Sequence, residues 1–159
     1  MKRSILFYVL LLVLVVVLLA EDIPLLKVRA AIVPQRLARG QEGNVTLKFS
    51  IEEGMTISPQ PYFRIELYPS EELVFPKDFF TASDLEMEII EENGYDFLSL
   101  QESVSIPFMV RLEAKRGNHI LRGRVKFFAF SREGGWCLKD KTEFSTTFYT
   151  SNRIYPRRK

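Results

Sequence analysis

The sequence predicts an all-β fold, an antiparallel β-sandwich, preceded by an N-terminal signal or anchor helix. Three observations predict it. Apolar and polar residues alternate in five segments, turn signals separate these segments, and no long helical stripe follows the apolar N-terminus. The chain has 159 residues, which is enough for one well-packed domain and short for two. We therefore expect residues 23–150 to form a single β-sandwich domain.

Residues 1–22 differ in composition from the rest of the chain. Two basic residues precede an uncharged apolar run, residues 5–20, and two acidic residues follow it. This layout is typical of a secretory signal, and the charge order places the remainder of the chain outside the cytoplasm. The run is slightly shorter than a membrane-spanning helix, and Leu18 stands where a cleavage site has a small residue. We expect an exported, periplasmic or extracytoplasmic protein, either soluble after cleavage or anchored to the inner membrane.

The alternating segments follow one another along the chain. In residues 45–51 every second side chain is apolar, which is the pattern of a strand with one buried face. The pattern recurs at residues 63–67, 104–112, 121–127 and 144–148. Turn signals lie at residues 39–44, 52–55, 58–61, 92–94, 115–118 and 132–135. Pro107 falls inside one of the strands, so we expect an edge or a bulge there, because proline cannot donate to a central ladder.

Two longer segments resemble a known family. Residues 28–58, VRAAIVPQRLARGQEGNVTLKFSIEEGMTIS, contain a strand, a proline, a turn with a glycine and a second strand. Residues 117–148, GNHILRGRVKFFAFSREGGWCLKDKTEFSTTF, contain a glycine-containing strand, a loop, a cysteine and a last strand. This order resembles the N-terminal domain of the thiol:disulfide interchange protein DsbD and its stand-alone relatives. The resemblance implies an immunoglobulin-like sandwich that acts outside the cytoplasm.

Cys137 is the single cysteine of the chain and the candidate thiol for chemistry. In the DsbD family two cysteines flank the loop and shuttle electrons, and Cys137 matches the second of them. The place of the first falls at or next to Phe130, which has no sulfur. A dithiol cycle needs a second sulfur at a Cα separation of about 4.4–6.8 Å, so this chain cannot run that cycle alone. The redox activity of the family is therefore not carried over.

Three roles stay open for Cys137. As a small buried hydrophobe at the start of a strand it would be unreactive. As the odd cysteine of an exported protein it could bond another chain, either permanently or as a mixed disulfide with a thioredoxin-like partner. Arg132, Lys139 and Lys141 would activate the thiol if their side chains converged on it. One cysteine and one histidine support a metal site poorly, so we expect no metal and no cofactor.

Aromatic side chains near irregular segments form a second candidate site. The chain contains 13 phenylalanines and 6 tyrosines, more than the alternating core positions require. Exposed aromatic side chains on sandwich loops often anchor protein interfaces, although such rings can also fill a wide core. In the DsbD family an aromatic loop covers the cysteine pair, and YDFLSLQ (residues 95–101) or FPKDFF (residues 75–80) is its counterpart here. The expected partner-binding residues are Phe130, Trp136, Cys137, Tyr95 and Phe97.

The remaining charged and polar candidates are expected to be solvated. His119, the only histidine, stands beside a turn. Asp84, Glu86 and Glu88 alternate with apolar residues, which predicts the wet face of a strand rather than a calcium site. The balance of 22 basic and 20 acidic residues argues against nucleic-acid binding, and the basic tail at residues 151–159 is expected to lie in solvent.

The sequence thus predicts an exported, non-catalytic binding or accessory domain. It would contact an extracytoplasmic protein through the face around Phe130, Trp136 and Cys137. One alternative is thiol-disulfide exchange through Cys137 with a thioredoxin-like partner or a membrane redox protein. Another is a purely structural domain tethered to a membrane by residues 5–20. Thiol accessibility in the native protein separates the first two, because exchange requires an exposed thiol.

Overall fold

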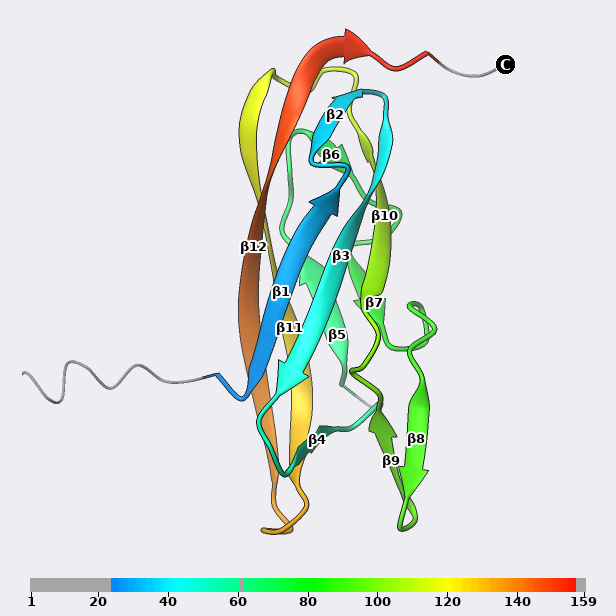
Figure 1. Ribbon diagram of the computed structural model, residues 1–159, viewed down its shortest axis with the longest axis vertical. Coiled ribbons are helices and arrows are strands. Elements are labelled where there is room, and N and C mark those ends of the chain that lie inside the picture. The colour runs from blue at the N-terminus through cyan, green and yellow to red at the C-terminus, as the bar shows by residue number, and fades with distance from the viewer. Residues whose placement is uncertain (1–23, 61, 157–159) are drawn as a thin grey trace, which may run out of the picture.

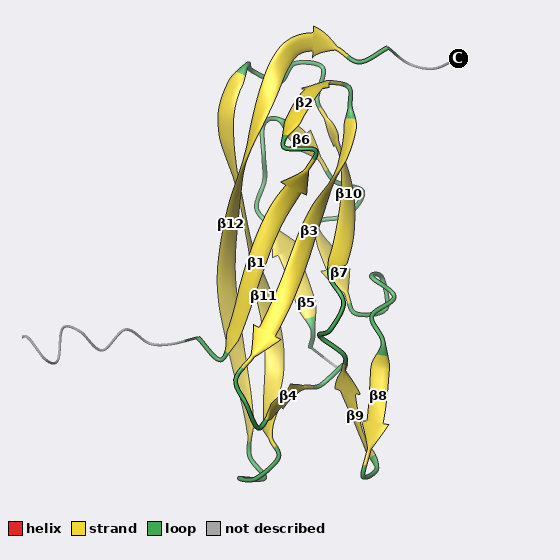
Figure 2. Ribbon diagram, in the orientation of Figure 1, coloured by secondary structure: helices red, strands yellow, loops and turns green. Residues whose placement is uncertain are grey.

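The computed structural model describes residues 24–60 and 62–156, and every regular element in this part of the chain is a β-strand (Figures 1 and 2). The predictions made for residues 1–22 lie outside the described residues. No helix in residues 24–60 or 62–156 is both long enough and apolar enough to span a membrane. The strands form two facing sheets and one separate hairpin, so the prediction of an all-β sandwich is confirmed.

The first sheet has four antiparallel strands. Their order is β1 (Leu26–Val33), β3 (Glu42–Ile51), β10 (Val104–Val110) and β6 (Leu73–Val74). The alternation predicted for residues 45–51 is confirmed, because Val45, Leu47 and Phe49 are buried. Strand β6 pairs only with Met109 and Val110, so it ends before it reaches Pro107. The ladder is therefore open on that side of Pro107, which agrees with the expected edge position.

The second sheet contains the two longest strands. Its order is β2 (Arg36–Arg39), β12 (Cys137–Ile154), β11 (Gly117–Ser131), β5 (Arg64–Leu67) and β7 (Phe79–Thr81), and β4 (Met55–Ile57) also pairs with β11. All pairs are antiparallel except β2 with β12. The predicted strands at residues 121–127 and 144–148 are the middle parts of β11 and β12. Strand β12 continues through Ile154, four residues into the segment expected to be a solvated tail.

A separate hairpin, β8 (Ile89–Glu92) and β9 (Tyr95–Leu98), lies beside the sandwich at the end where β11 turns into β12 (Figure 1). Its turn residues Asn93 and Gly94 have φ angles of 55° and 78°. Two successive left-handed residues are the mark of a tight hairpin turn of the type that Asn-Gly favours. The sequence ENG was predicted as a turn, and the hairpin around it was not.

The prediction of a strand through the acidic residues 84–88 is wrong. Residues 82–86 form turns, and Asp84 accepts hydrogen bonds from the backbone N–H and the hydroxyl of Thr81. Leu85 and Met87 are half-buried and pack against the core. A turn with two anchored apolar side chains produces the same alternation over a few residues as a strand does, which explains the error.

The core lies between the inner faces of the two sheets. Phe127 of β11 and Phe148 of β12 are its largest fully buried side chains. Inward positions alternate along β11, where Val125, Phe127 and Ala129 are each 0% exposed. The hydroxyl of Thr142 in β12 donates to the carbonyl of Leu26 in β1 at 2.9 Å, which links the two sheets along one edge. The outward side chains of β11, including Phe130, are left to form a surface.

Candidate functional site

Cys137 lies at the start of β12, directly opposite Phe130 of β11 in the antiparallel register. The connecting turn is held by Ser131, whose hydroxyl accepts from the N–H of Gly134 at 3.0 Å. The N–H of Ser131 also donates to the carbonyl of Trp136 at 3.0 Å. These bonds fix the turn, so Trp136 and Cys137 leave it in defined positions. Cys137 is exposed, and the alternative in which its thiol is buried is therefore wrong.

Phe130 is covered on its outer face by two rings of the β8–β9 hairpin. The ring centroids of Tyr95 and Phe130 are 5.8 Å apart, and those of Phe97 and Phe130 are 6.5 Å apart, with interplanar angles of 23° and 24°. Tyr95 and Phe97 also stack on each other at 6.5 Å. Offset stacking of this kind stabilises aromatic pairs beyond the burial of their area. Residues far apart in the sequence thus form one aromatic stack.

An ion pair connects the hairpin to the turn between β11 and β12. Arg132 Nη1 lies 3.0 Å from Glu92 Oε2, and the guanidinium of Arg132 lies 5.3 Å from the ring centroid of Phe97. Both side chains of the ion pair are about half exposed, so the pair contributes little net stability. Its effect is to keep the guanidinium over Phe97. This contact could not be predicted from the sequence, because no sequence pattern places Glu92 near the turn.

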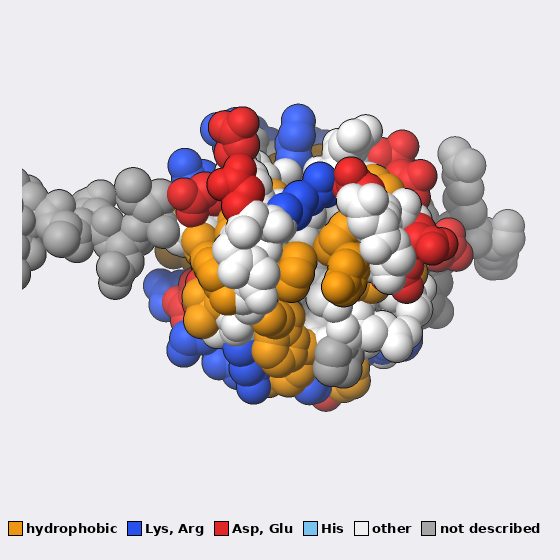
Figure 3. Space-filling view, turned by 90° about the horizontal axis from the view of Figure 1, so that it is seen from below, with side chains coloured by type: hydrophobic (Ala, Val, Ile, Leu, Met, Phe, Trp, Pro, Cys, Tyr) orange, Lys and Arg blue, Asp and Glu red, His pale blue; other side chains and the backbone are white. Residues whose placement is uncertain are grey.

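We call Tyr95, Phe97, Phe130, Trp136 and Cys137 the aromatic end of the sandwich. Tyr95 is 60% exposed and Trp136 is 46% exposed, whereas Phe97 is buried and Phe130 is half-buried. Figure 3 views this end and shows hydrophobic side chains gathered near its middle, with basic and acidic side chains around them. The structure therefore brings the hairpin residues Tyr95 and Phe97 onto Phe130, which lies opposite Cys137. That these residues bind a partner stays a prediction.

The other aromatic candidate, FPKDFF (residues 75–80), lies elsewhere and is largely used for packing. Phe80 is 5% exposed, and Phe75 packs on Phe108 with ring centroids 5.8 Å apart. Phe79 is 38% exposed and lies under the guanidinium of Arg64 at 3.7 Å. The YDFLSLQ segment, and not FPKDFF, supplies the rings that stack on Phe130, the cross-strand neighbour of Cys137.

Two of the three basic side chains close to Cys137 in sequence, those of Arg132 and Lys139, have other partners. Arg132 contacts Glu92 and Phe97, and the ammonium of Lys139 lies 4.1 Å from the ring centroid of Tyr62. The hydrogen bond from Lys139 lowers the pKa of the Tyr62 phenol, although burial acts in the opposite direction. Arg132 and Lys139 thus form part of a charged rim around the aromatic end.

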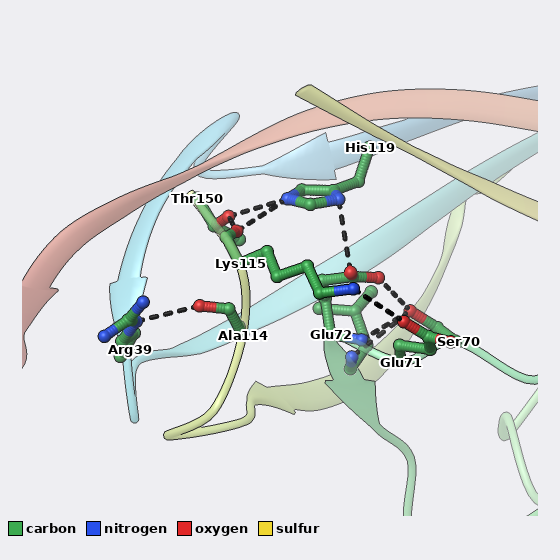
Figure 4. A network of polar contacts seen from close by, with 9 residues as sticks. Arg39, Ser70, Glu71, Glu72, Ala114, Lys115, His119 and Thr150 are labelled. Atoms are coloured by element: carbon green, nitrogen blue, oxygen red, sulfur yellow. Dashed lines mark hydrogen bonds and ion pairs between the residues drawn. The ribbon is translucent and has the colours of Figure 1, made fainter. Parts of the chain in front are cut away.

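The prediction that His119 is solvated is wrong. Its ring lies in a polar network (Figure 4). Its Nε2 is 2.7 Å from the hydroxyl of Thr150 and 2.9 Å from the carbonyl of Lys115, and its Nδ1 is 3.4 Å from Glu72 Oε1. The His119 side chain is only 15% exposed. Phe130 lies eleven positions after His119 in β11, a distance of about 36 Å along a strand. A catalytic pair of His119 with Cys137 is therefore excluded.

Residues 24–60 and 62–156 contain no cluster of three or more His, Cys, Asp or Glu side chains placed to hold a metal ion. The acidic residues 84–88 do not converge, because Asp84 is bound to Lys77 and Thr81 and Glu86 has a left-handed backbone.

Comparisons with known proteins identify no family. No family model matches the chain, and no curated protein matches it. Among solved structures, the chain is similar to a cohesin module of a family 33 glycoside hydrolase from Clostridium perfringens, with a TM-score of 0.47, 7% identity, and coverage of 82% of this chain and 100% of that one. It is also similar to BcpA, the major pilin subunit of Bacillus cereus, with a TM-score of 0.36, 10% identity, and coverage of 79% and 39%.

A third similar structure is the CooA pilin subunit from enterotoxigenic Escherichia coli, with a TM-score of 0.29, 11% identity, and coverage of 84% of this chain and 100% of that chain. All three TM-scores are below 0.5, so these similarities do not assign the fold. The two-sheet architecture is assigned from the strand pairing of this chain alone. None of the three descriptions names the DsbD family, and the resemblance to that family stays a prediction.

Proposed function

We propose that this protein is an exported, non-catalytic domain that binds another extracytoplasmic protein through its aromatic end. The observation that carries the proposal is the stack of Tyr95, Phe97 and Phe130, which is only partly covered. The exposed Trp136 belongs to the turn that follows Phe130. Protein interfaces commonly have aromatic anchors at the centre and charged residues at the rim. Here Arg132, Glu92 and Lys139 form that rim.

The geometry of the stack favours binding over a purely structural role. Rings that only filled the core would point between the sheets, as Phe127 does. Phe130 instead projects outward from β11. Of the two hairpin rings that cover it, the ring of Tyr95 is itself 60% exposed. Stacked rings of low conformational entropy lose little freedom when a partner covers them. A partner would therefore complete the burial that the hairpin begins.

The same arrangement supports the proposed relationship to the N-terminal domain of DsbD. Phe130 stands at the expected place of the first family cysteine and is the direct cross-strand partner of Cys137. Directly opposed residues of antiparallel strands have Cα atoms about 4.5–5.5 Å apart, which is within the range that a disulfide bridges. The chain would then be a relative in which phenylalanine replaces one half of a cross-strand disulfide, and the hairpin covers that phenylalanine.

The exposed thiol of Cys137 favours one second candidate, thiol-disulfide exchange with a thioredoxin-like partner. In that reaction the Cys137 thiolate attacks a substrate disulfide, which releases one substrate thiol and leaves the other substrate sulfur bonded to Cys137. A dithiol partner then attacks the Cys137 sulfur of this mixed disulfide. The partner's second thiolate then resolves the new disulfide, so that Cys137 and the substrate are released as thiols and the partner is oxidised. The partner supplies both electrons, and Cys137 supplies only the point of attachment.

Co-purification from cells that carry the natural partner tests the first proposal. The double variant Tyr95→Ala/Trp136→Ala should lose the partner, because it removes two exposed aromatic side chains without touching the core. Ile120 and Leu112 are exposed to a similar degree, 57% and 59%, and Ile120→Ala/Leu112→Ala is the matched control that should retain it. Equal recovery with both variants would refute binding through the aromatic end.

Cys137→Ser separates the two candidates. If binding is non-covalent, this variant retains the partner, because serine preserves the shape of the aromatic end. If exchange is the function, the wild-type chain forms a reducible adduct with a thioredoxin-like protein whose resolving cysteine is changed to serine, and Cys137→Ser forms none. Absence of that adduct for the wild-type chain would refute thiol-disulfide exchange through Cys137.

A further inference from the structure

A pocket of about 730 Å³ lies at the opposite end of the sandwich, between β2 and the last part of β12. An irregularity in the β2–β12 ladder accompanies it. Thr150 pairs with Leu37 and Ile154 pairs with Arg39, so three residues of β12 face the single residue Ala38 of β2. A bulge of this kind bends a strand and re-aims its side chains. The bulged residues 151–153 line the pocket.

The charge of the pocket lining is entirely positive. Arg36, Arg116 and Arg153 contribute to the lining, and no Asp or Glu does. None of the three arginines makes an ion pair with a carboxylate among residues 24–60 and 62–156. Guanidinium groups held close together repel one another, and a bound anion offsets this repulsion.

Tyr149 holds two of these arginines in place. Arg36 is the register partner of Tyr149 in the parallel ladder, and its guanidinium lies 4.7 Å from the centroid of the Tyr149 ring. Arg116 approaches from the loop before β11, and its Nε donates to the Tyr149 hydroxyl at 3.0 Å. The two guanidinium groups are therefore positioned by one side chain before any ligand arrives. Preorganisation of this kind lowers the cost of binding.

We propose that this pocket binds a small organic ligand through a phosphate or carboxylate group held by Arg36 and Arg116. The planar guanidinium matches the two oxygens of such a group, and Arg is the preferred residue for this contact. The pocket has the volume of a small-molecule site, and Ser151, Asn152 and the half-exposed Tyr155 are available to the rest of the ligand. This site is at the other end of the molecule from the aromatic end and does not depend on the proposed function.

Titration of the full chain in neutral detergent with inorganic phosphate and, separately, with glucuronate tests the proposal. The arginine Nε–Hε signals are followed by NMR at constant ionic strength, with chloride as the reference anion. We expect saturable shifts with at least one of the two probes, and which probe saturates tells phosphate from carboxylate. Shifts that grow linearly with both probes, as with chloride, would overturn the proposal.

Two comparisons show where the probe binds. Arg36→Ala/Arg116→Ala should weaken binding by at least about tenfold, the loss of roughly one charge-assisted hydrogen bond. Arg29→Ala/Arg122→Ala removes the same charge from exposed positions outside the pocket and should leave binding unchanged. Equal weakening by the two double variants would mean that only net charge matters, and the pocket would not be the site.

The phenol of Tyr149 gives a second readout that does not depend on affinity. The hydrogen bond from Arg116 lowers the pKa of Tyr149 below 10.0, burial opposes this, and the charges of Arg116 and Arg36 lower it further. A bound anion neutralises these arginines, so the pKa of Tyr149 should rise when the probe saturates. Tyr149→Phe identifies the transition in an ultraviolet titration. A Tyr149 transition that the saturating probe does not move would overturn the assignment of the anion to Arg36 and Arg116.

Discussion

The inward and outward aromatic residues of β11 should differ clearly in their effect on stability. Phe127 is 0% exposed between the sheets, and a phenylalanine side chain buries on the order of 150 Å². At about 25 cal/mol per Å² the transfer contribution is roughly 4 kcal/mol, and the cavity left in a closed core adds to it. Phe127→Ala should therefore lower the free energy of unfolding by about 3–5 kcal/mol.

Phe130→Ala removes a ring of the same size from a half-buried site. Only part of the ring area is withdrawn from water, and the space left behind opens to solvent beneath the hairpin. The remaining loss is that of two offset stacks with Tyr95 and Phe97, so we expect about 1–2 kcal/mol. Both variants delete the same atoms. The ratio of their losses in free energy of unfolding therefore reports only the difference in surroundings between Phe127 and Phe130.

Urea unfolding at equilibrium measures both values, provided that the dependence of the free energy on urea is the same for each variant. Ile120→Ala, at a position that is 57% exposed, is the control and should change the free energy by less than about 0.5 kcal/mol. If Phe130→Ala costs as much as Phe127→Ala, Phe130 is part of the core and the aromatic end is not a binding surface.

Three further predictions follow from individual contacts. Lys77 and neighbouring hydrogen bonds lower the pKa of Asp84 from 3.8 to about 2, so its stabilising effect is present above about pH 4 and is lost as the pH falls toward 2. The difference in free energy of unfolding between wild type and Asp84→Asn, measured by urea unfolding, should shrink as the pH falls from about 4 to 2. A difference that stays constant would contradict this role of Asp84. Gly123→Ala should destabilise by about 1–3 kcal/mol, because the new Cβ would lie 2.7 Å from the backbone carbonyl of Glu66, and an unchanged melting temperature would show that the strands can separate. A maleimide should label Cys137 in the native chain at a rate close to that in the urea-unfolded chain, and labelling only after unfolding would place the thiol in the interior.

The strands that alternate over many residues could be predicted from the sequence. The alternating apolar residues of β3 and of β10 up to Val110 face the core as expected, and those of β11 fix Phe127 inside. The error at residues 84–88 has a physical cause, since a turn that anchors Leu85 and Met87 gives the same short pattern as a strand. The bulge of β12 beyond Thr150 was not predictable, because it depends on pairing with β2.

The candidate site could be predicted as a set of residues but not as an arrangement. Phe130 and Cys137 were expected to be close, and the register pairs them directly. The position of Tyr95 and Phe97 depends on the β8–β9 hairpin, whose signal was present in the Asn-Gly turn at residues 93 and 94. Exposure of Cys137 was not predictable, because it depends on how far the β11–β12 turn extends beyond the other sheet.

Site-specific photo-crosslinking in cells that produce the natural partner is the most direct test of binding through the aromatic end. A photoreactive phenylalanine analogue at position 95 replaces an exposed aromatic ring with another ring of similar size. The same analogue at position 120 is the control, because that site is equally exposed and lies near the other end of β11. We predict one discrete protein adduct from position 95 and none of the same mass from position 120. No adduct at position 95, or the same adducts at both positions, would contradict the proposal that the aromatic end binds a partner.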